Sequence, residues 1–378
     1  MRHSPSLQSR NPAMDLIRLT ALFCVVSIHF FLHTTFYDTP VTNAVMAAAT
    51  IMRNGFMVCV PLFLLLSGYL LKNRTACKRY YAKLVYTIVI YVLASFCCSL
   101  YRKPVISDLH GLVSYLVNLF DGLLNYSIAP YAWYVEMYIG LFLLIPWLNI
   151  LYNALQTQQQ RRYLILTMLL LTSFPGVLNI YRFNPSWWLN PTSNHFYYKL
   201  LPMAWIDSFP ITYYFIGAYL RDYPLAGSTK RTLLLTMGFY LFNGLFNVYR
   251  SWGLPHVQGY WHDYCSLFIV ILSVLIFTTF TKFDYSKFGV RTIRLISRLS
   301  ELCFGAYLVS WIFDDWIYTR FQTIFGNVFH LEHYFLIVPI VFVCSLTLSA
   351  VINTFYDIGA NVIARIYHHF APVKIHSD

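Results

Sequence analysis

The chain has 378 residues, of which 58% are hydrophobic, 19% aromatic and only 11% charged, whereas a soluble domain usually carries about 25% charged residues. Its apolar residues form blocks long enough to cross a hydrocarbon core about 30 Å thick, which excludes a soluble globular protein. The net charge of +12 would suit a nucleic-acid-binding protein, but the basic residues lie between the apolar blocks, where they act as orientation signals, so no nucleic acid is expected.

Ten apolar segments are predicted to span the membrane as helices. In chain order they are residues 14–32, 52–71, 84–101, 132–152, 163–180, 204–220, 232–249, 263–280, 300–318 and 334–356. Residues 110–126 have apolar side chains at helical spacing but include Asp121, which predicts an amphipathic helix at the membrane interface. Residues 181–203 and 250–262 are rich in Pro, Trp, Tyr, Asn and His, and are predicted to form structured loops over a site.

The distribution of Lys and Arg predicts how these spans are oriented. With the N-terminus in the cytoplasm, 19 of the 27 Lys and Arg residues fall in cytoplasmic segments and 6 fall outside, as the positive-inside rule requires. We therefore expect an all-α polytopic transmembrane helical bundle of about ten spans with both termini cytoplasmic. Its parts are a tail at residues 1–13, one membrane-embedded domain at 14–356 and a second tail at 357–378.

The first predicted span carries ionisable residues that are costly inside a membrane. Asp15, Arg18, His29 and His33 interrupt an otherwise apolar segment, and such residues are candidates for function. Arg18 and His29 are eleven positions apart, about three helical turns or 16.5 Å, so they share one helix face. Arg can hold a phosphate or carboxylate with two hydrogen bonds, and neutral His can act as a general base. The alternative to a functional role is a structural one, in which Arg18 extends toward the membrane surface and His29 forms a hydrogen bond in the protein core.

These residues begin a series of motifs through which the chain resembles the acyltransferase-3 family of integral membrane proteins. The series covers nearly the whole chain in the family's order. It comprises Asp15-Leu-Ile-Arg18 with His29, Pro61 to Leu71 with Ser67-Gly68-Tyr69, Tyr80-Tyr-Ala-Lys83-Leu, Trp133-Tyr134-Val-Glu136 with Pro146, and Ser297 to Ser310 with Ser300, Gly305 and Tyr307.

The resemblance implies an O-acyltransferase, most simply an O-acetyltransferase, in the inner membrane of a bacterial cell. It implies that acetyl-CoA or another acyl-CoA is the donor, and that a hydroxyl of a cell-surface or lipid-linked glycan is the acceptor. His29 is the expected general base, with Arg18 and Glu136 as further catalytic residues. The donor is expected to bind at Arg18, Ser67, Gly68, Lys78, Arg79 and Lys83, and the acceptor at Trp133, Tyr134, Tyr307 and Ser310.

The chain departs from the family pattern at two motifs. Lys83 and then Tyr86 stand where the family often has paired Arg, so phosphate binding there would be shared among Lys78, Arg79 and Lys83. Ser310 stands where the family often has His. Because no hydrolase-like domain follows the spans, transfer is expected to finish within the membrane domain.

Several alternatives remain open from the sequence. A transporter or exporter of glycan precursors would also use charges near the membrane midplane, whereas a structural or signalling scaffold fits the Arg18 and His29 pair poorly. Glu136 is expected to orient His29, to bind a sugar hydroxyl or to form a structural hydrogen bond. Asp314 and Asp315, flanked by Trp311 and Trp316, are predicted to form a solvated helix end, with acceptor binding as the alternative.

Two further groups of residues have side chains that could bind a ligand. His29 and His33 have a spacing that suits a metal ion, but the sequence offers no convincing third ligand, so no metal is expected. The outer-loop residues have aromatic faces that suit sugars, although an interfacial aromatic belt explains most of them. They are Trp187, Trp188, His195, Trp252, His256, Trp261 and His262.

Overall fold

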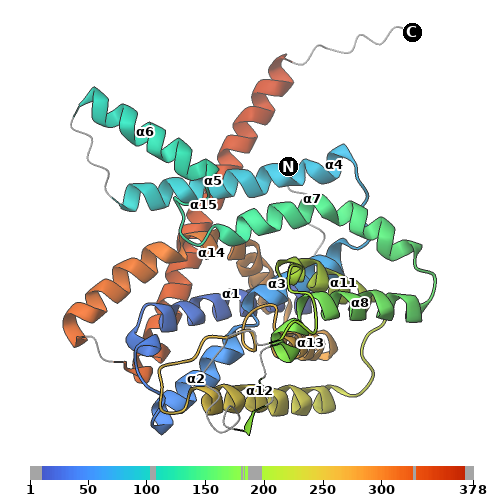
Figure 1. Ribbon diagram of the computed structural model, residues 1–378. Helices are drawn as coiled ribbons and strands as arrows, with labels where there is room; N and C mark the ends of the chain where they lie inside the picture. The colour runs from blue at the N-terminus through green and yellow to red at the C-terminus, as the bar shows by residue number, and fades with distance from the viewer. Residues whose placement is uncertain are drawn as a thin grey trace.

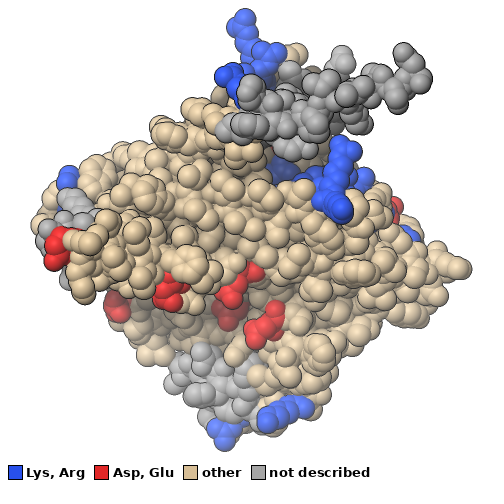
Figure 2. All heavy atoms as spheres, turned by 90° about the horizontal axis from the view of Figure 1, so that it is seen from above, with Lys and Arg blue, Asp and Glu red and all other residues tan. Residues whose placement is uncertain are grey.

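The computed structural model describes residues 11–102, 108–179, 182, 184–185, 198–326 and 329–370, and these form a bundle of α-helices (Figure 1). In the described ranges the β-type contact is an isolated bridge between Val41 and Trp252. Figure 2 shows a face on which uncharged atoms predominate and acidic residues are few. The prediction of an all-α polytopic bundle is confirmed.

The long helices are joined by short helical segments and turns. In chain order the α-helices are α1 (Pro12–Leu32), α2 (Ala44–Phe56), α3 (Cys59–Leu71), α4 (Lys78–Tyr81), α5 (Lys83–Tyr101), α6 (Leu109–Leu124), α7 (Trp133–Ala154), α8 (Gln158–Thr172), α9 (Pro175–Leu178), α11 (Phe209–Asp222), α12 (Thr229–Ser251), α13 (Leu267–Lys282), α14 (Val290–Phe325) and α15 (Tyr334–Phe370). The 3₁₀ turns are η2 (Thr35–Tyr37), η3 (Ile206–Ser208) and η4 (Leu331–His333).

Seven helical segments of the described chain are long and apolar enough to cross a membrane. They are Pro12–Leu32, Ala44–Leu71, Lys78–Tyr101, Trp133–Ala154, Thr229–Ser251, Val290–Phe325 and Leu331–Arg365. The other three predicted spans correspond to α8, α11 and α13, which have 15, 14 and 16 residues. A helix of 15 residues is only about 22 Å long, so the count of ten spans stays a prediction, as does the cytoplasmic location of the termini.

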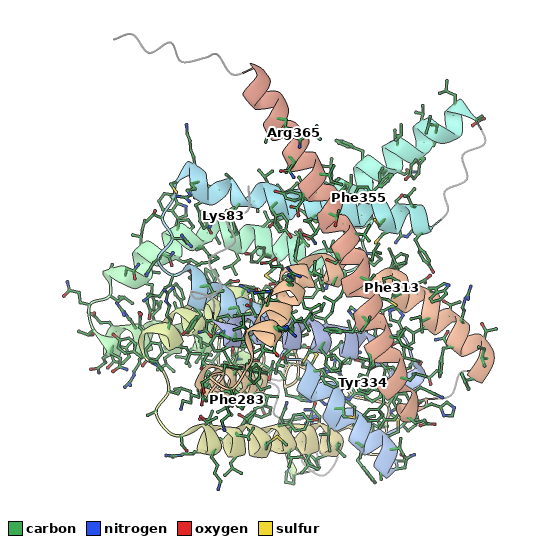
Figure 3. The ribbon with its side chains drawn as sticks, turned by 180° about the vertical axis from the view of Figure 1, so that it is seen from behind. Lys83, Phe283, Phe313, Tyr334, Phe355 and Arg365 are labelled. Atoms are coloured by element: carbon green, nitrogen blue, oxygen red, sulfur yellow. The ribbon has the colours of Figure 1, made fainter. Side chains whose placement is uncertain are left out.

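Two helices extend well beyond the segments predicted for them, and a third, α6, matches its predicted segment closely. α14 continues to Phe325 and α15 to Phe370, well beyond the predicted ends at residues 318 and 356. Arg365 lies on the part of α15 that projects past the other helices (Figure 3). The predicted amphipathic segment is helical as α6, and its apolar side chains are mostly exposed. Its position at the membrane interface stays a prediction.

The helix α1 lies inside the bundle, where it contacts α2, α3, α13, α14 and α15. Its buried residues lie on all sides, which is typical of a helix enclosed by protein or lipid. α1 begins at Pro12 behind Asn11, whose side chain accepts a hydrogen bond from the backbone N–H of Ala13 and caps the helix. The ionisable residues of α1 are therefore held on a rigid central element.

Two glycines allow α3 and α11 to approach closely. A Cβ on Gly68 of α3 would overlap the carbonyl oxygen of Tyr214, and a Cβ on Gly217 of α11 would overlap the carbonyl oxygen of Leu65. Small residues at helix contacts let backbones approach within a membrane bundle. Helix packing therefore explains why position 68 is glycine, and the role of Gly68 in donor binding stays a prediction.

The carboxylate of Asp222, at the end of α11, connects four helices. Lys72, which follows α3, pairs with Oδ1. Arg161 of α8 places Nη1 2.9 Å from Oδ2, and the hydroxyl of Tyr152 in α7 donates to Oδ2 at 3.3 Å. These side chains are at most 19% exposed, so the cluster is mostly shielded from water and is expected to contribute to stability.

Replacing Asp222 with alanine is expected to lower the melting temperature of the detergent-solubilised protein. Lys72 and Arg161 would lose the anion that they share, at a cost of about 1–3 kcal/mol for such a partly shielded pair. Asp121→Ala, which removes an exposed carboxylate from α6, is the control. Thermal unfolding followed with a thiol-reactive dye measures both variants, and equal melting temperatures for Asp222→Ala and wild type would refute the stabilising role.

Candidate active site

Arg18 belongs to a three-residue cluster at one end of α1. Its Nη1 lies 3.0 Å from Asp15 Oδ1 and donates to Ser300 Oγ at 3.3 Å. The Ser300 hydroxyl donates to the same Asp15 oxygen at 2.8 Å. Asp15 is buried, whereas the Arg18 side chain is 32% exposed. The guanidinium is thus anchored at Nη1 and oriented by Asp15, which leaves the rest of the group available to an anionic ligand.

His29 lies three turns further along α1 and is paired with an aspartate. Its Nδ1 is 3.0 Å from Oδ2 of Asp314 on α14. The N–H direction does not meet hydrogen-bond geometry, since Nδ1 has no such partner, so the contact is a close electrostatic pair. Nδ1 is buried, and His29 as a whole is 8% exposed. Asp314 is fully buried, so its charge acts on His29 with little screening.

Two more side chains extend this pair into a polar network. The Tyr131 hydroxyl donates to Asp314 Oδ2 at 2.9 Å and lies 2.8 Å from His33 Nε2. Because the single hydroxyl proton is used toward the carboxylate, His33 must carry its proton on Nε2 and donate to the Tyr131 oxygen. The Tyr131 ring also stacks on His29, with ring centroids 3.8 Å apart. The imidazole of His29 is therefore fixed on one edge by Asp314 and on one face by Tyr131.

The contacts to α14 test the predicted geometry of α1. Arg18 contacts Ser300 and His29 contacts Asp314, so both side chains project toward the same neighbouring helix. The two residues also lie on one uninterrupted helix. The shared face expected from their spacing is what the structure shows. The catalytic roles of both residues stay predictions, and a snorkelling Arg18 with a core His29 stays the alternative.

Asp314 differs from the solvated helix end that the sequence predicted. α14 continues for eleven residues beyond it, and its side chain is buried against His29 and Tyr131. Asp314 and not Glu136 therefore contacts His29. Glu136 is exposed in the first turn of α7 and has no ion pair in the described ranges. Its catalytic role stays a prediction, and orientation of His29 by Glu136 is not what the structure shows.

The four residues predicted to bind the acceptor have different surroundings. Trp133 is 42% exposed and stacks on Tyr264 at 5.9 Å. Tyr134 is buried and packs edge-on against Tyr307. The Tyr307 hydroxyl donates to the backbone oxygen of Tyr131, and buried Ser310 donates to the backbone oxygen of Tyr307. Tyr307 thus helps to position Tyr131, while Trp133 has the most surface available to a ligand.

The basic residues predicted to bind the donor lie toward the end of the bundle away from His29, and are called the basic region below. Lys78, Arg79 and Lys83 are exposed on α4 and α5, and Arg79 is close enough to act electrostatically on Lys83. In Figure 3 Lys83 and Phe283 lie toward one side of the ribbon and Tyr334 toward the other. Ser67 donates to the backbone oxygen of Phe63 within α3.

A row of aromatic side chains runs from this basic region toward His29. Tyr80 of α4 stacks on Phe142 with ring centroids 4.3 Å apart, and Phe142, Tyr138 and Tyr134 follow one another at helical spacing along α7 with centroids 6.1 Å apart. Tyr134 then contacts Tyr307, which holds the Tyr131 backbone. Residues i and i+4 share a helix face, so these side chains form one row on α7 whose Tyr134 end contacts α14.

One group of described residues brings metal-binding atoms together, away from this network. The donor atoms of His330, Glu332 and His333 lie within 4.8 Å of one another near η4. His330 Nδ1 is 2.9 Å from Glu332 Oε1, which already satisfies both groups. His29 and His33 have Asp314 and Tyr131 as neighbours instead. The expectation of no metal at the active site stays a prediction.

Of the outer-loop residues that the structure describes, three are enclosed by the protein and one is exposed, and their place in an interfacial belt stays a prediction. Trp261 is fully buried, and its Nε1 donates to Asn247 Oδ1 at 3.0 Å. His256 and His262 are also buried, and burial lowers the pKa of both well below the ordinary range, so both are neutral at pH 7. Trp252 is 58% exposed. Trp187, Trp188 and His195 lie outside the described residues.

The sequence matches the profile of the acyltransferase-3 family, described as an acyltransferase domain, over residues 11–354. Comparison with curated proteins and with solved structures found no match. The matched region begins before α1 and ends within α15, so it includes Arg18, His29 and Asp314. The resemblance inferred from the motifs is confirmed, and the chain belongs to the acyltransferase-3 family of membrane acyltransferases.

Proposed function

We propose that the protein transfers an acyl group, most simply acetyl, from cytoplasmic acyl-CoA to a hydroxyl of a cell-surface or lipid-linked glycan. The observation that carries this proposal is the pairing of His29 Nδ1 with the buried carboxylate of Asp314 at 3.0 Å. A carboxylate beside one ring nitrogen stabilises the imidazolium that forms when the other nitrogen takes a proton. A bacterial inner membrane, where both substrates are available on opposite sides, is the proposed location.

In the proposed reaction His29 Nε2 removes the proton from the acceptor hydroxyl as the hydroxyl oxygen attacks the thioester carbonyl. The new C–O bond forms and the C–S bond breaks. The CoA thiolate leaves and takes the proton back from His29, so the imidazole is neutral again at the end of the cycle. Asp314 stabilises the transient imidazolium, and Tyr131 keeps the ring in place.

The donor is proposed to extend from the basic region toward His29. Lys78, Arg79 and Lys83 would attract the CoA phosphates, since clustered exposed cations raise the local concentration of a polyanion. The thioester arm would follow the aromatic row of α7 past Arg18, whose guanidinium retains free donors. Trp133, the most exposed of the predicted acceptor residues, would meet the sugar.

Ester formation distinguishes this function from carriage of a glycan. Surface glycan from cells with and without the gene is compared by proton NMR, and an ester-linked acyl signal is expected only with the gene. Purified protein in vesicles should release CoA from acyl-CoA only when glycan acceptor is present. Vesicles that moved glycan without forming ester would instead support the transporter of glycan precursors and overturn the proposal.

Neutralising the basic region is expected to weaken donor binding. Lys78→Gln, Arg79→Gln and Lys83→Gln together should raise the Michaelis constant for acyl-CoA about tenfold, because three exposed charge contacts contribute about 0.5 kcal/mol each. The turnover number should change little, since these contacts are equally present before and during the reaction.

The matched control for this triple variant removes the same charge elsewhere. Lys287→Gln, Arg291→Gln and Arg294→Gln alter exposed residues of another segment predicted to be cytoplasmic. Steady-state kinetics at varied acyl-CoA compare the two triple variants. An equal rise in both would indicate general attraction by net charge, and no rise in either would leave the basic region as an orientation signal.

A further inference from the structure

A surface pocket of about 540 Å³ lies where the end of α5 meets the second half of α14. This α5–α14 pocket is on the side of the molecule predicted to face away from the cytoplasm, because α5 ends there and α14 has passed through the bundle. Its lining combines three aromatic rings, two guanidinium groups and one carboxylate: Tyr101, Arg102, Trp311, Asp315, Trp316 and Arg320.

The aromatic and charged groups of the pocket hold one another in place. The Tyr101 hydroxyl donates to Asp315 Oδ2 at 2.8 Å, and the Tyr101 ring meets Trp311 edge to face. The Arg102 guanidinium lies 4.8 Å from the centre of the Trp311 ring, and that of Arg320 lies 4.7 Å from the Trp316 ring. Such cation–π contacts orient a guanidinium while leaving its N–H groups free to donate.

The pocket has an excess of positive charge. Among the ion pairs of the described ranges none involves Arg102 or Arg320. Asp315 already accepts the hydrogen bond from Tyr101. Trp316 is 45% exposed, so part of an indole face is open to a ligand. Two guanidinium groups beside an open aromatic face suit a ligand that has both a carboxylate and an apolar ring face.

The pocket lies beside the candidate active site. Asp315 directly follows Asp314, and consecutive residues of a helix point about 100° apart, so one carboxylate faces His29 and the next faces the pocket. Tyr131 in turn links Asp314 to His33 by hydrogen bonds. A ligand in the pocket would therefore be adjacent to the network that contains His29.

Resting on the acyl transfer proposed above, we propose that the α5–α14 pocket binds an acidic sugar residue of the acceptor glycan. Arg102 and Arg320 would bind its carboxylate, and the sugar ring would stack on Trp316. Asp315 would accept a hydrogen bond from a sugar hydroxyl. The sugar that receives the acyl group would then be a neighbour of the acidic sugar in the glycan. The glycan acceptor is thereby narrowed to an anionic polysaccharide or oligosaccharide.

Binding of a matched pair of oligosaccharides to the full chain in nanodiscs tests this proposal. One contains glucuronic acid, and the other is its carboxyl-reduced, neutral counterpart. The acidic oligosaccharide should bind about tenfold or more tightly, as a charge-assisted hydrogen bond requires. Arg320→Gln should remove this preference, and Trp316→Ala should weaken binding of both sugars. Lys287→Gln, which removes an exposed charge from a segment predicted to be cytoplasmic, should change neither.

Three results would overturn the proposal. They are no binding of the acidic sugar to wild type, equal binding of the two sugars, or an unchanged preference in Arg320→Gln. If Arg320→Gln instead weakened binding to vesicles of anionic phospholipid while leaving sugar binding intact, the pocket would be a lipid headgroup site. Ester formation is measured separately, so a protein that binds acidic sugar without transferring acyl groups would refute the proposed function and not the pocket.

Discussion

Replacing His29 with alanine is expected to reduce acyl transfer about 100-fold or more, the loss typical of a positioned general base. Among the described residues, His29 supplies the imidazole that is paired with Asp314, and the change removes it. The turnover number should fall while the Michaelis constant for acyl-CoA stays near its wild-type value, because the basic region that is proposed to bind the donor is intact. Ester formation on glycan by the purified protein in vesicles is the measurement.

Two further variants make this result interpretable. His29→Asn keeps a side-chain nitrogen near the position of Nδ1 but has no second ring nitrogen, so it should preserve the fold and still be inactive. His110→Ala removes an exposed histidine of α6 and should remain active. His33 is unsuitable as a control because its Nε2 contacts Tyr131. Near-normal esterification by well-folded His29→Ala would show that another group removes the proton.

Replacing Asp314 with asparagine is expected to lower the turnover number about 100-fold or more, since an uncharged amide cannot stabilise the imidazolium of His29. Asparagine has nearly the same shape and still accepts the hydrogen bond from Tyr131, so the protein should remain folded. Asp314 is proposed to act through His29, which it contacts, and not through the substrate. The Michaelis constants for donor and acceptor should therefore change little, which steady-state kinetics with each substrate varied will determine.

The control for this prediction removes a carboxylate charge from another part of the chain. Asp121→Asn alters an exposed carboxylate of α6 and should leave the kinetics unchanged. Combining His29→Ala with Asp314→Asn should cost little more than His29→Ala alone, because the two residues act as one unit. If the losses in turnover number of the two single variants multiplied in the double variant, Asp314 would act independently of His29. That result would refute the positioning role.

The sequence predicted the main features of α1 because they depend on local spacing. Helical periodicity alone places Arg18 and His29 on one face, and both contact α14. The order of the motifs also predicted the acyltransferase-3 family, which the match over residues 11–354 confirms. These inferences needed no knowledge of how distant helices pack.

The partners of His29 were not predicted because they depend on the packing of distant segments. Asp314 comes near the end of an apolar run and beside another aspartate, a pattern that is typical of a helix terminus. The helix continues to Phe325, so the residue is buried instead. Tyr131 lies in the turn before α7 and is one of 31 tyrosines, so only its contacts with Asp314 and His33 distinguish it.

The number of spans was harder to predict for a related physical reason. Hydropathy measures how apolar a segment is, but a helix covered by neighbouring helices can be as apolar as one that crosses the bilayer. Most side chains of α11 are buried in the protein, and the helix has only 14 residues. Backbone at membrane depth is tolerated in short segments when protein covers it, so length cannot be inferred from composition there.

The pairing of His29 with Asp314 joins residues near opposite ends of the chain, and this has a consequence for biogenesis. During synthesis α1 enters the membrane long before α14 has been translated, so a nascent chain has the imidazole without its carboxylate. With His29 and Asp314 acting as proposed, acyl transfer would begin only after residue 314 has been synthesised and α14 has packed beside α1. A chain that stalls or is cleaved before α14 would therefore be expected to lack acyl transfer, however well its earlier helices are inserted.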